Sequence, residues 1–269
     1  MKNGGRRRSV EADMSDNQQS EKMPLTAHLE ELRKRLLRSL IAAFIAFGIC
    51  YNFKERLFEV LTRPLVESMP KNSYMIYTSL PEAFFNYLKV SFFAGLVVSS
   101  PYILYQTWKF ISPGLYASEK KHVIPFVLTS TILFVSGVLF GYFLALPPAF
   151  RFFLQFSTDF LKPMLTLREY LSLSLKLLLA FGIVFEIPVF IFFLAKIGVV
   201  NATLLKKQRK YAILLIFCIA AVLTPTPDAF TQALMAVPMM ILYEVGIVVA
   251  RWGEKKTAGK EAKEAPEGL

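Results

Sequence analysis

The sequence predicts an all-α, polytopic membrane protein with six transmembrane helices. Hydrophobic residues make up 54% of the chain, which has 269 residues and 25 phenylalanines. Long apolar stretches alternate with short polar ones, as in proteins that cross a bilayer repeatedly. We expect the spanning helices at residues 36–53, 86–108, 123–146, 171–197, 211–223 and 232–250.

The distribution of basic residues predicts the orientation of these helices. Six spans place both termini on the same side of the membrane. The segments expected on that side hold 22 Lys and Arg residues, against 8 on the opposite side. Because basic residues concentrate in cytoplasmic loops, both termini are predicted to be cytoplasmic. The net charge of +11 is therefore interpreted as a sign of membrane orientation, and no nucleic-acid partner is expected.

Two polar segments flank a single helical domain. Residues 1–23 are polar and poor in aromatic side chains, so we expect a disordered cytoplasmic tail. Residues 24–252 are predicted to form the six-helix transmembrane domain. Residues 253–269 are again polar and are expected to form a cytoplasmic C-terminal tail.

The connections between the spans carry prolines and one unusually short helix. Residues 54–85 are expected to form two short amphipathic pieces at the membrane interface. Pro147 and Pro148 are predicted to end the third span, because proline lacks the backbone N–H of a helix interior. The fifth span has 13 residues, about 20 Å of helix, against a hydrocarbon core of roughly 30 Å. We therefore expect a thinned bilayer here, or a hairpin submerged from one side.

The fourth span holds a carboxylate and a proline near its middle. Glu186 lies two residues before Pro188 in the stretch FGIVFEIPVF. An ionised side chain at the bilayer centre costs about 2.5–3.5 kcal/mol on insertion scales. Glu186 must therefore be protonated, paired, or facing a polar cavity, while Pro188 opens the helix at the same depth. The pattern predicts a polar point inside the membrane.

The sequence gives little support to an enzyme. It has two histidines, His28 and His122, and it lacks HExxH, GxSxG, Walker A and GxGxxG patterns. We expect no catalytic residues, no metal and no cofactor. Asp228, in the turn TPTPDAF, is interpreted as the N-cap of the sixth helix.

Acidic residues in basic surroundings are the remaining candidates for a binding site. Singly, Glu30 and Glu31 are interpreted as i,i+4 partners of Lys34 and Arg35, and Glu119 as an acidic residue near a helix N-terminus. Together they suggest a cytoplasmic surface with carboxylates set among cations. Such a surface could bind a cationic peptide, because guanidinium pairs bidentately with carboxylate. Phe110 would add an apolar contact, although an ordinary interfacial aromatic is an equal alternative.

Four motifs, in this order, resemble the TatC family, the core receptor subunits of the twin-arginine protein translocase. They are AHLEELRKRL, SPYILYQTWKFISPGLYASEKK, FGIVFEIPVF and LTPTPDAFTQALMAVP, and the resemblance covers about residues 24–252. It implies a concave, glove-like set of six helices with short fifth and sixth helices in the bacterial inner membrane. It also implies binding of twin-arginine signal peptides, single-span TatA- and TatB-type partners, a homo-oligomeric receptor complex in membrane lipid, and transport driven by the proton-motive force.

The resemblance also implies roles for individual residues. Glu31 and Glu119 would receive the two arginines of a signal peptide. The same site would be lined by Leu32, Arg33 and Phe110.

A second group of positions is implied to be structural or to contact partners. Pro64 belongs to the loop on the outer side, and Pro101 is expected to be structural within the second span. Glu186, with Pro188, would polarise a membrane-buried groove and contact partner helices. Asp228 belongs to the hairpin beside which a TatB-type helix would dock.

Two other function classes remain open from the sequence. A proton-coupled secondary transporter would explain Glu186 and Pro188 equally well, but it leaves the cytoplasmic motifs unexplained, and the chain shows no internal repeat. An assembly scaffold without a cargo site is a third class. Binding of an Arg-Arg peptide in preference to Lys-Lys distinguishes a receptor from both, because lysine lacks the planar fork of arginine.

Overall fold

The computed structural model describes residues 25–69, 75–111, 123–156, 166–223 and 228–264. Within these ranges the regular structure is helical, apart from one isolated bridge between Ile76 and Thr166, which confirms the predicted all-α class. The expected tail at residues 1–23 lies outside the described part of the chain.

Four helical segments are long and apolar enough to cross a membrane. They are Glu82–Ile111, Ile124–Leu154, Leu167–Lys196 and Ala229–Trp252, and the bent pair Ala27–Tyr51 with Lys54–Val66 adds a fifth if it counts as one span. Helix α10 (Arg209–Leu223) is apolar but has 15 residues, about 22 Å. The described chain is thus a membrane protein with four to five helices of spanning length.

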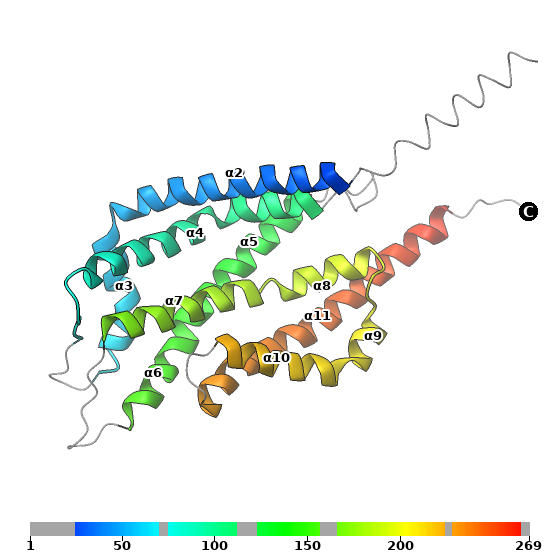
Figure 1. Ribbon diagram of the computed structural model, residues 1–269. Helices are drawn as coiled ribbons and strands as arrows, with labels where there is room; N and C mark the ends of the chain where they lie inside the picture. The colour runs from blue at the N-terminus through cyan, green and yellow to red at the C-terminus, as the bar shows by residue number, and fades with distance from the viewer. Residues whose placement is uncertain (1–24, 70–74, 112–122, 157–165, 224–227, 265–269) are drawn as a thin grey trace, which may run out of the picture.

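Helices α2 (Leu25–Tyr51) and α4 (Glu82–Ile111) run side by side in opposite directions (Figure 1). Their backbones approach closely at Gly95, where an added Cβ would lie 2.7 Å from the amide nitrogen of Phe47. A larger residue at position 95 would force the two helices apart. This close packing sets the register that brings the start of α2 to the end of α4.

The third span continues beyond the two prolines expected to end it. Helix α5 (Val123–Phe140) runs through a π-helical turn, η3 (Gly141–Ala145), into α6 (Leu146–Leu154). Pro147 and Pro148 fall in the first turn of α6, where a missing N–H is tolerated, and the π turn changes the hydrogen-bond register just before them. The predicted end of this span was therefore wrong.

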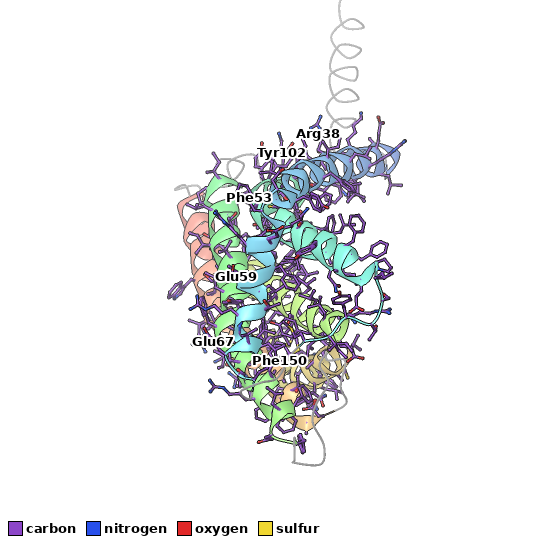
Figure 2. The ribbon with its side chains drawn as sticks, turned by 90° about the vertical axis from the view of Figure 1, so that its left-hand side faces the viewer. Arg38, Phe53, Glu59, Glu67, Tyr102 and Phe150 are labelled. Carbon is purple, nitrogen blue, oxygen red and sulfur yellow. The ribbon has the colours of Figure 1, made fainter. Side chains whose placement is uncertain are left out.

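One helix, not two, occupies the described part of residues 54–85 before α4 begins. This helix, α3 (Lys54–Val66), turns 88° away from α2. Figure 2 shows it lying along the α5–α6 column, with Phe53 near one end and Glu67 near the other. Its apolar face buries Leu61 and Leu65 in the main core. Helix α3 is therefore held in place by packing against the bundle, and not by the membrane interface alone.

Pro64 inside α3 leaves a backbone acceptor that another helix satisfies. Proline has no N–H, so the carbonyl of Val60, four residues earlier, loses its helical partner. The hydroxyl of Tyr142, from η3, donates to that carbonyl at 2.6 Å. The hydroxyl of Tyr170, from α7, donates to the neighbouring carbonyl of Leu61 at 2.5 Å. Two tyrosines therefore fix the kinked helix to the bundle.

Pro101 inside α4 shows the same solution within a single helix. Its missing N–H frees the carbonyl of Val97, and the hydroxyl of Ser100 donates to that carbonyl at 2.7 Å. The helix continues to Ile111 without a break. Pro101 is thus accommodated by a local side-chain bond.

The second half of the chain is built from a broken span and a hairpin. Helices α7 (Leu167–Val184) and α8 (Ile187–Lys196) meet at the break, and α9 (Ala202–Lys207) leads into α10. The last helix, α11 (Ala229–Glu264), packs along α8. It continues past residue 252, where the sequence suggested a polar tail.

We predict that removing the hydroxyl of Tyr170 or Tyr142 destabilises the fold. Tyr170→Phe removes the bond to the Leu61 carbonyl and Tyr142→Phe the bond to the Val60 carbonyl, and each should cost about 0.5–1.5 kcal/mol. Each kcal/mol corresponds to about 2–4 °C in Tm for a chain of this size, measurable by thermal unfolding in detergent.

The double variant tests the cause. Pro64→Ala supplies an N–H that can bond the Val60 carbonyl, so Tyr142→Phe should cost less in that background. Tyr211→Phe, at an exposed tyrosine, serves as the control and should leave Tm unchanged. If Tyr142→Phe lowers Tm equally in the wild type and in the Pro64→Ala background, the explanation is wrong.

Candidate functional site

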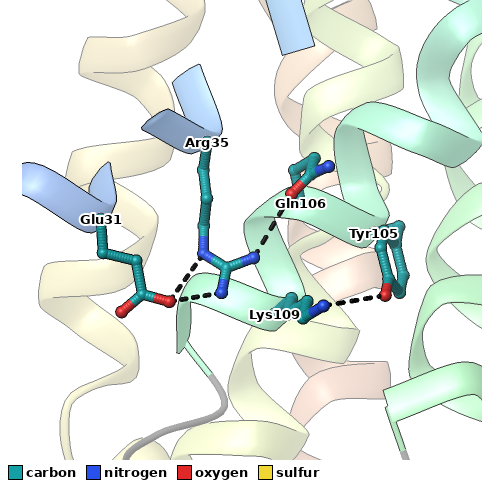
Figure 3. A network of polar contacts seen from close by, with 5 residues as sticks. All are labelled: Glu31, Arg35, Tyr105, Gln106 and Lys109. Carbon is teal, nitrogen blue, oxygen red and sulfur yellow. Dashed lines mark hydrogen bonds and ion pairs between the residues drawn. The ribbon is translucent and has the colours of Figure 1, made fainter. Parts of the chain in front are cut away.

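The first candidate site lies where the start of α2 meets the end of α4. Helix α2 places Glu31 and Arg35 one turn apart, and the Arg35 Nε donates to Glu31 Oε1 at 3.0 Å. A second guanidinium nitrogen, Nη2, contacts the same carboxylate oxygen. Figure 3 shows the pair facing α4. The predicted i,i+4 pair is therefore present, and it brings two N–H groups of one guanidinium to one carboxylate.

Arg35 also connects the two helices. Its Nη1 donates to Oε1 of Gln106 on α4 at 3.3 Å, and the Gln106 side chain is buried. The side chains of Arg35 and Glu31 are 13% and 25% exposed, whereas the neighbouring pair Lys34–Glu30 is 64% exposed at both ends. The Glu31 carboxylate is thus more accessible than the guanidinium that it holds.

An aromatic stack closes one end of this site. The Phe110 ring on α4 lies over the His28 imidazole on α2, with centroids 4.5 Å apart and ring planes 22° apart. His28 precedes Glu31 by three residues, so both lie on one helix face. We call His28, Glu31, Arg35, Gln106 and Phe110 the α2–α4 polar site. It combines a carboxylate with an aromatic surface, which suits a cationic peptide.

The other predicted residues of this site are placed differently. Leu32 and Arg33 are exposed on α2, and Arg33 is two residues from Glu31, about 200° around the helix. Glu119 lies outside the described residues. The structure therefore brings Glu31 and Phe110 together with Arg35 and Gln106, and it leaves the place of Glu119 undescribed.

The second candidate site is the break between α7 and α8. Phe185 and Glu186 form the break, and Pro188 occupies the first turn of α8, where its missing N–H is tolerated. The position of Pro188 agrees with the predicted opening of the span. The break itself separates two helices that otherwise pack as one spanning element.

Glu186 is buried at this break with its carboxylate poorly satisfied. The residue is 5% exposed, and neither carboxylate oxygen has a hydrogen bond to the described residues. The Ser130 hydroxyl on α5 is the polar side chain that faces it. A buried acid without hydrogen bonds is costly, so Glu186 is an unsatisfied polar group within the described bundle.

Ser130 is itself held by Trp108. The indole Nε1 of Trp108 donates to the Ser130 oxygen at 2.8 Å, and both side chains are buried. The Trp108 ring also packs on Phe126, Phe190 and Phe193, with centroids 5.2, 5.6 and 5.4 Å away. An aromatic cluster therefore joins the end of α4 to α5 and α8 beside Glu186.

Asp228 caps the last helix, as the sequence suggested. Its Oδ1 accepts from the backbone N–H of Thr231 at 2.7 Å, and its carbonyl accepts from Gln232 at 3.2 Å. These bonds satisfy donors at the start of α11. A structural role thus accounts for this carboxylate within the hairpin.

Several functional candidates were missed from the sequence. Three of them are polar side chains inside apolar spans, a pattern that can be seen in the sequence: Gln106, Trp108 and Ser130. Glu82 was also missed, because a carboxylate at a span end is ordinary. It is buried, and its two oxygens accept from the backbone N–H of Thr78 at 2.8 Å and of Arg168 at 3.0 Å. Glu82 therefore ties the loop before α4 to the start of α7.

Metal chemistry has no ligand cluster in the part of the chain that the structure describes. No group of three His, Cys, Asp or Glu side chains there is placed to hold an ion.

Comparison with known proteins connects these sites to one family. A model of the family described as Sec-independent protein translocase protein (TatC) matches residues 27–238. The TatC protein of Desulforapulum autotrophicum is 50% identical over 246 residues, which cover 91% of each chain. That of Escherichia coli strain K12 is 37% identical over 238 residues, covering 88% of this chain and 92% of the relative.

A solved structure shares the fold over most of the chain. The crystal structure described as "Twin Arginine Translocase Receptor- TatC" has a TM-score of 0.76 and 42% sequence identity. The match covers 84% of this chain and 99% of that chain. With the family model matching most of the sequence, the chain belongs to the TatC family, and it is a membrane protein of the Sec-independent protein translocase.

Proposed function

We propose that this chain is the receptor of the twin-arginine system, binding Arg-Arg signal peptides at its cytoplasmic face. The observation that carries the proposal is the Glu31–Arg35 contact, in which a part-buried carboxylate already accepts two N–H groups from one guanidinium. A peptide arginine offers the same donors. Glu119 would receive the second arginine, and Leu32, Arg33 and Phe110 would contact the rest of the peptide.

The proposed topology has six spans with both termini cytoplasmic in the bacterial inner membrane. The start of α2 and the end of α11 lie at the same end of the bundle (Figure 1), which supports an even number of crossings. The excess of Lys and Arg in the segments on that side supports a cytoplasmic position. In the proposed topology α10 is the short fifth span and α11 the sixth, and the six spans would form the glove-like, concave arrangement that the resemblance implies.

The proposed partners are TatA- and TatB-type single-span proteins, with transport driven by the proton-motive force in a homo-oligomeric complex. Glu186 supports this, because a buried carboxylate without hydrogen bonds in the described chain can accept a polar side chain from a partner helix. Helix α10 exposes most of its apolar side chains, including Leu214, Leu215 and Val222. In the proposed complex, the hairpin that Asp228 caps offers this surface to a partner.

The proton-coupled transporter remains the competing proposal for Glu186. It uses the same buried carboxylate but gives no role to the α2–α4 polar site. Membership of the TatC family favours the receptor, and the two proposals differ in their ligand. A transporter takes up a small solute with protons, whereas a receptor binds a peptide.

We predict that Glu31→Gln removes most signal-peptide binding while the protein still inserts. Loss of a charge-assisted pair costs about 1.5–3 kcal/mol, about 10- to 100-fold in Kd. A photo-reactive probe at position 110 should crosslink an Arg-Arg peptide to the wild type, and a Lys-Lys peptide much less.

The neighbouring carboxylate gives a matched control. Glu30→Gln removes an equal charge one residue away, from an exposed pair with Lys34, and should leave crosslinking intact. Undiminished crosslinking in Glu31→Gln, or equal crosslinking of the two peptides to the wild type, would overturn the receptor proposal.

A second prediction separates cargo binding from assembly. Glu186→Ala should keep Arg-Arg crosslinking at position 110 but weaken co-purification of TatA- or TatB-type subunits and export. Glu186→Gln retains hydrogen-bonding groups of similar shape and should be milder than Ala. If Glu186→Ala instead fails to insert into the membrane, Glu186 is structural, and its proposed contact with partners is wrong.

A further inference from the structure

We propose that the last two turns of α4 couple the α2–α4 polar site to Glu186, with Gln106 and Trp108 as positioning residues. This inference rests on the proposed function, because it assigns a consequence to signal-peptide binding. Gln106 contacts the guanidinium that occupies Glu31, and Trp108 contacts the elements around Glu186. The short segment between them therefore touches both sites.

The first step is competition for one carboxylate. Arg35 bonds Glu31 and Gln106 at the same time. Both of its contacts with Glu31 use Oε1, and the more exposed Glu31 side chain can be approached by a peptide guanidinium. An arriving arginine would share the carboxylate with Arg35, and the repulsion between the two cations weakens the contact of Arg35 with Glu31. The bond from Arg35 to Gln106 is then strained or lost.

The second step is transmission through a rigid helix. Gln106 and Trp108 are two residues apart, so their side chains leave α4 about 200° from each other. Both are buried, Gln106 against α2 and Trp108 against α5 and α8. If Arg35 moves and Gln106 moves with it, this part of α4 rotates or shifts. The same movement of the helix must displace the Trp108 indole on its opposite face.

The third step ends at Glu186 itself. Trp108 packs on Phe190, and the backbone N–H of Phe190 donates to the carbonyl of Glu186 at 3.0 Å. Trp108 also donates to Ser130. Because indole is only a donor, the Ser130 oxygen is the acceptor of this bond, and Trp108 thereby fixes the place of the hydroxyl near Glu186. Moving Trp108 thus shifts the first turn of α8 and the hydroxyl beside Glu186 together.

The consequence is a carboxylate whose exposure depends on cargo. With Arg35 on Glu31, Glu186 is 5% exposed and shielded from a partner helix. Peptide binding loosens the Trp108 contacts and opens Glu186 to a polar partner side chain.

The test measures the reactivity of Glu186 toward dicyclohexylcarbodiimide, which modifies buried carboxylic acids, in the full chain in lipid nanodiscs. Mass spectrometry follows labelling with and without a saturating Arg-Arg peptide. In the wild type the peptide should raise the labelling rate of Glu186 by about 5-fold or more, the usual range for coupled sites. Glu82, the other glutamate that is buried among the described residues, should label equally under both conditions.

Two variants remove the same bond from opposite ends. Trp108→Phe and Ser130→Ala should both bind the peptide yet lose most of the peptide-induced change, and the small Ser130→Ala change guards against misfolding. Trp252→Phe, at a tryptophan that is 65% exposed, should respond like the wild type. For each variant, the labelling rate of Glu186 with peptide is divided by its rate without peptide. This ratio cancels any direct effect of the substitution on the basal labelling of Glu186.

The contrary outcomes are distinct. Peptide binding without a change at Glu186 in the wild type overturns the coupling but leaves the receptor proposal intact. An undiminished change in both variants shows that the coupling does not pass through Trp108. Failure of the wild type to bind the Arg-Arg peptide overturns the proposed function and this inference with it.

Discussion

The structure depends on the requirement that backbone polar groups inside a membrane find their partners within the protein. Each proline within a helix removes one donor and challenges that requirement. Tyr142 satisfies the carbonyl freed by Pro64, and Ser100 satisfies the one freed by Pro101. At Pro188 the chain ends one helix and begins another. Each of these three prolines therefore lies where a hydroxyl or a helix start makes up for the missing N–H.

Glu186 is a second polar group that must find a place inside the bundle, and it lies at a helix break. The residue lies between α7 and α8, and Ser130 of α5 is a polar side chain near it. The Glu186 side chain is buried, yet its oxygens lack hydrogen bonds to described residues. The fold thus holds an unsatisfied acceptor within the described bundle, and the proposed contact with a partner helix would give this acceptor a donor.

Features set by local sequence were predictable, and those set by distant contacts were not. The Glu31–Arg35 pair and the Asp228 cap follow from spacing along one helix, and both are present. The continuation through Pro147 was missed, because its π turn depends on the packing of neighbouring helices. Gln106 meets Arg35 only because α2 and α4 pack in one register, so the sequence revealed the carboxylate of the site but not its connection to α4.

Glu82 gives the bundle a mechanical asymmetry. Its carboxylate fastens the loop before α4 to the first turn of α7, so the N-terminal end of α4 is fixed to the bundle. The helix has 30 residues, a length of about 45 Å. A tilt of about 5° around its N-terminal end displaces its C-terminal end by about 4 Å over that length, which is the size of a side-chain contact. Small tilts are therefore sufficient to make or break contacts near Gln106, while the loop and the start of α7 beside Glu82 keep their place.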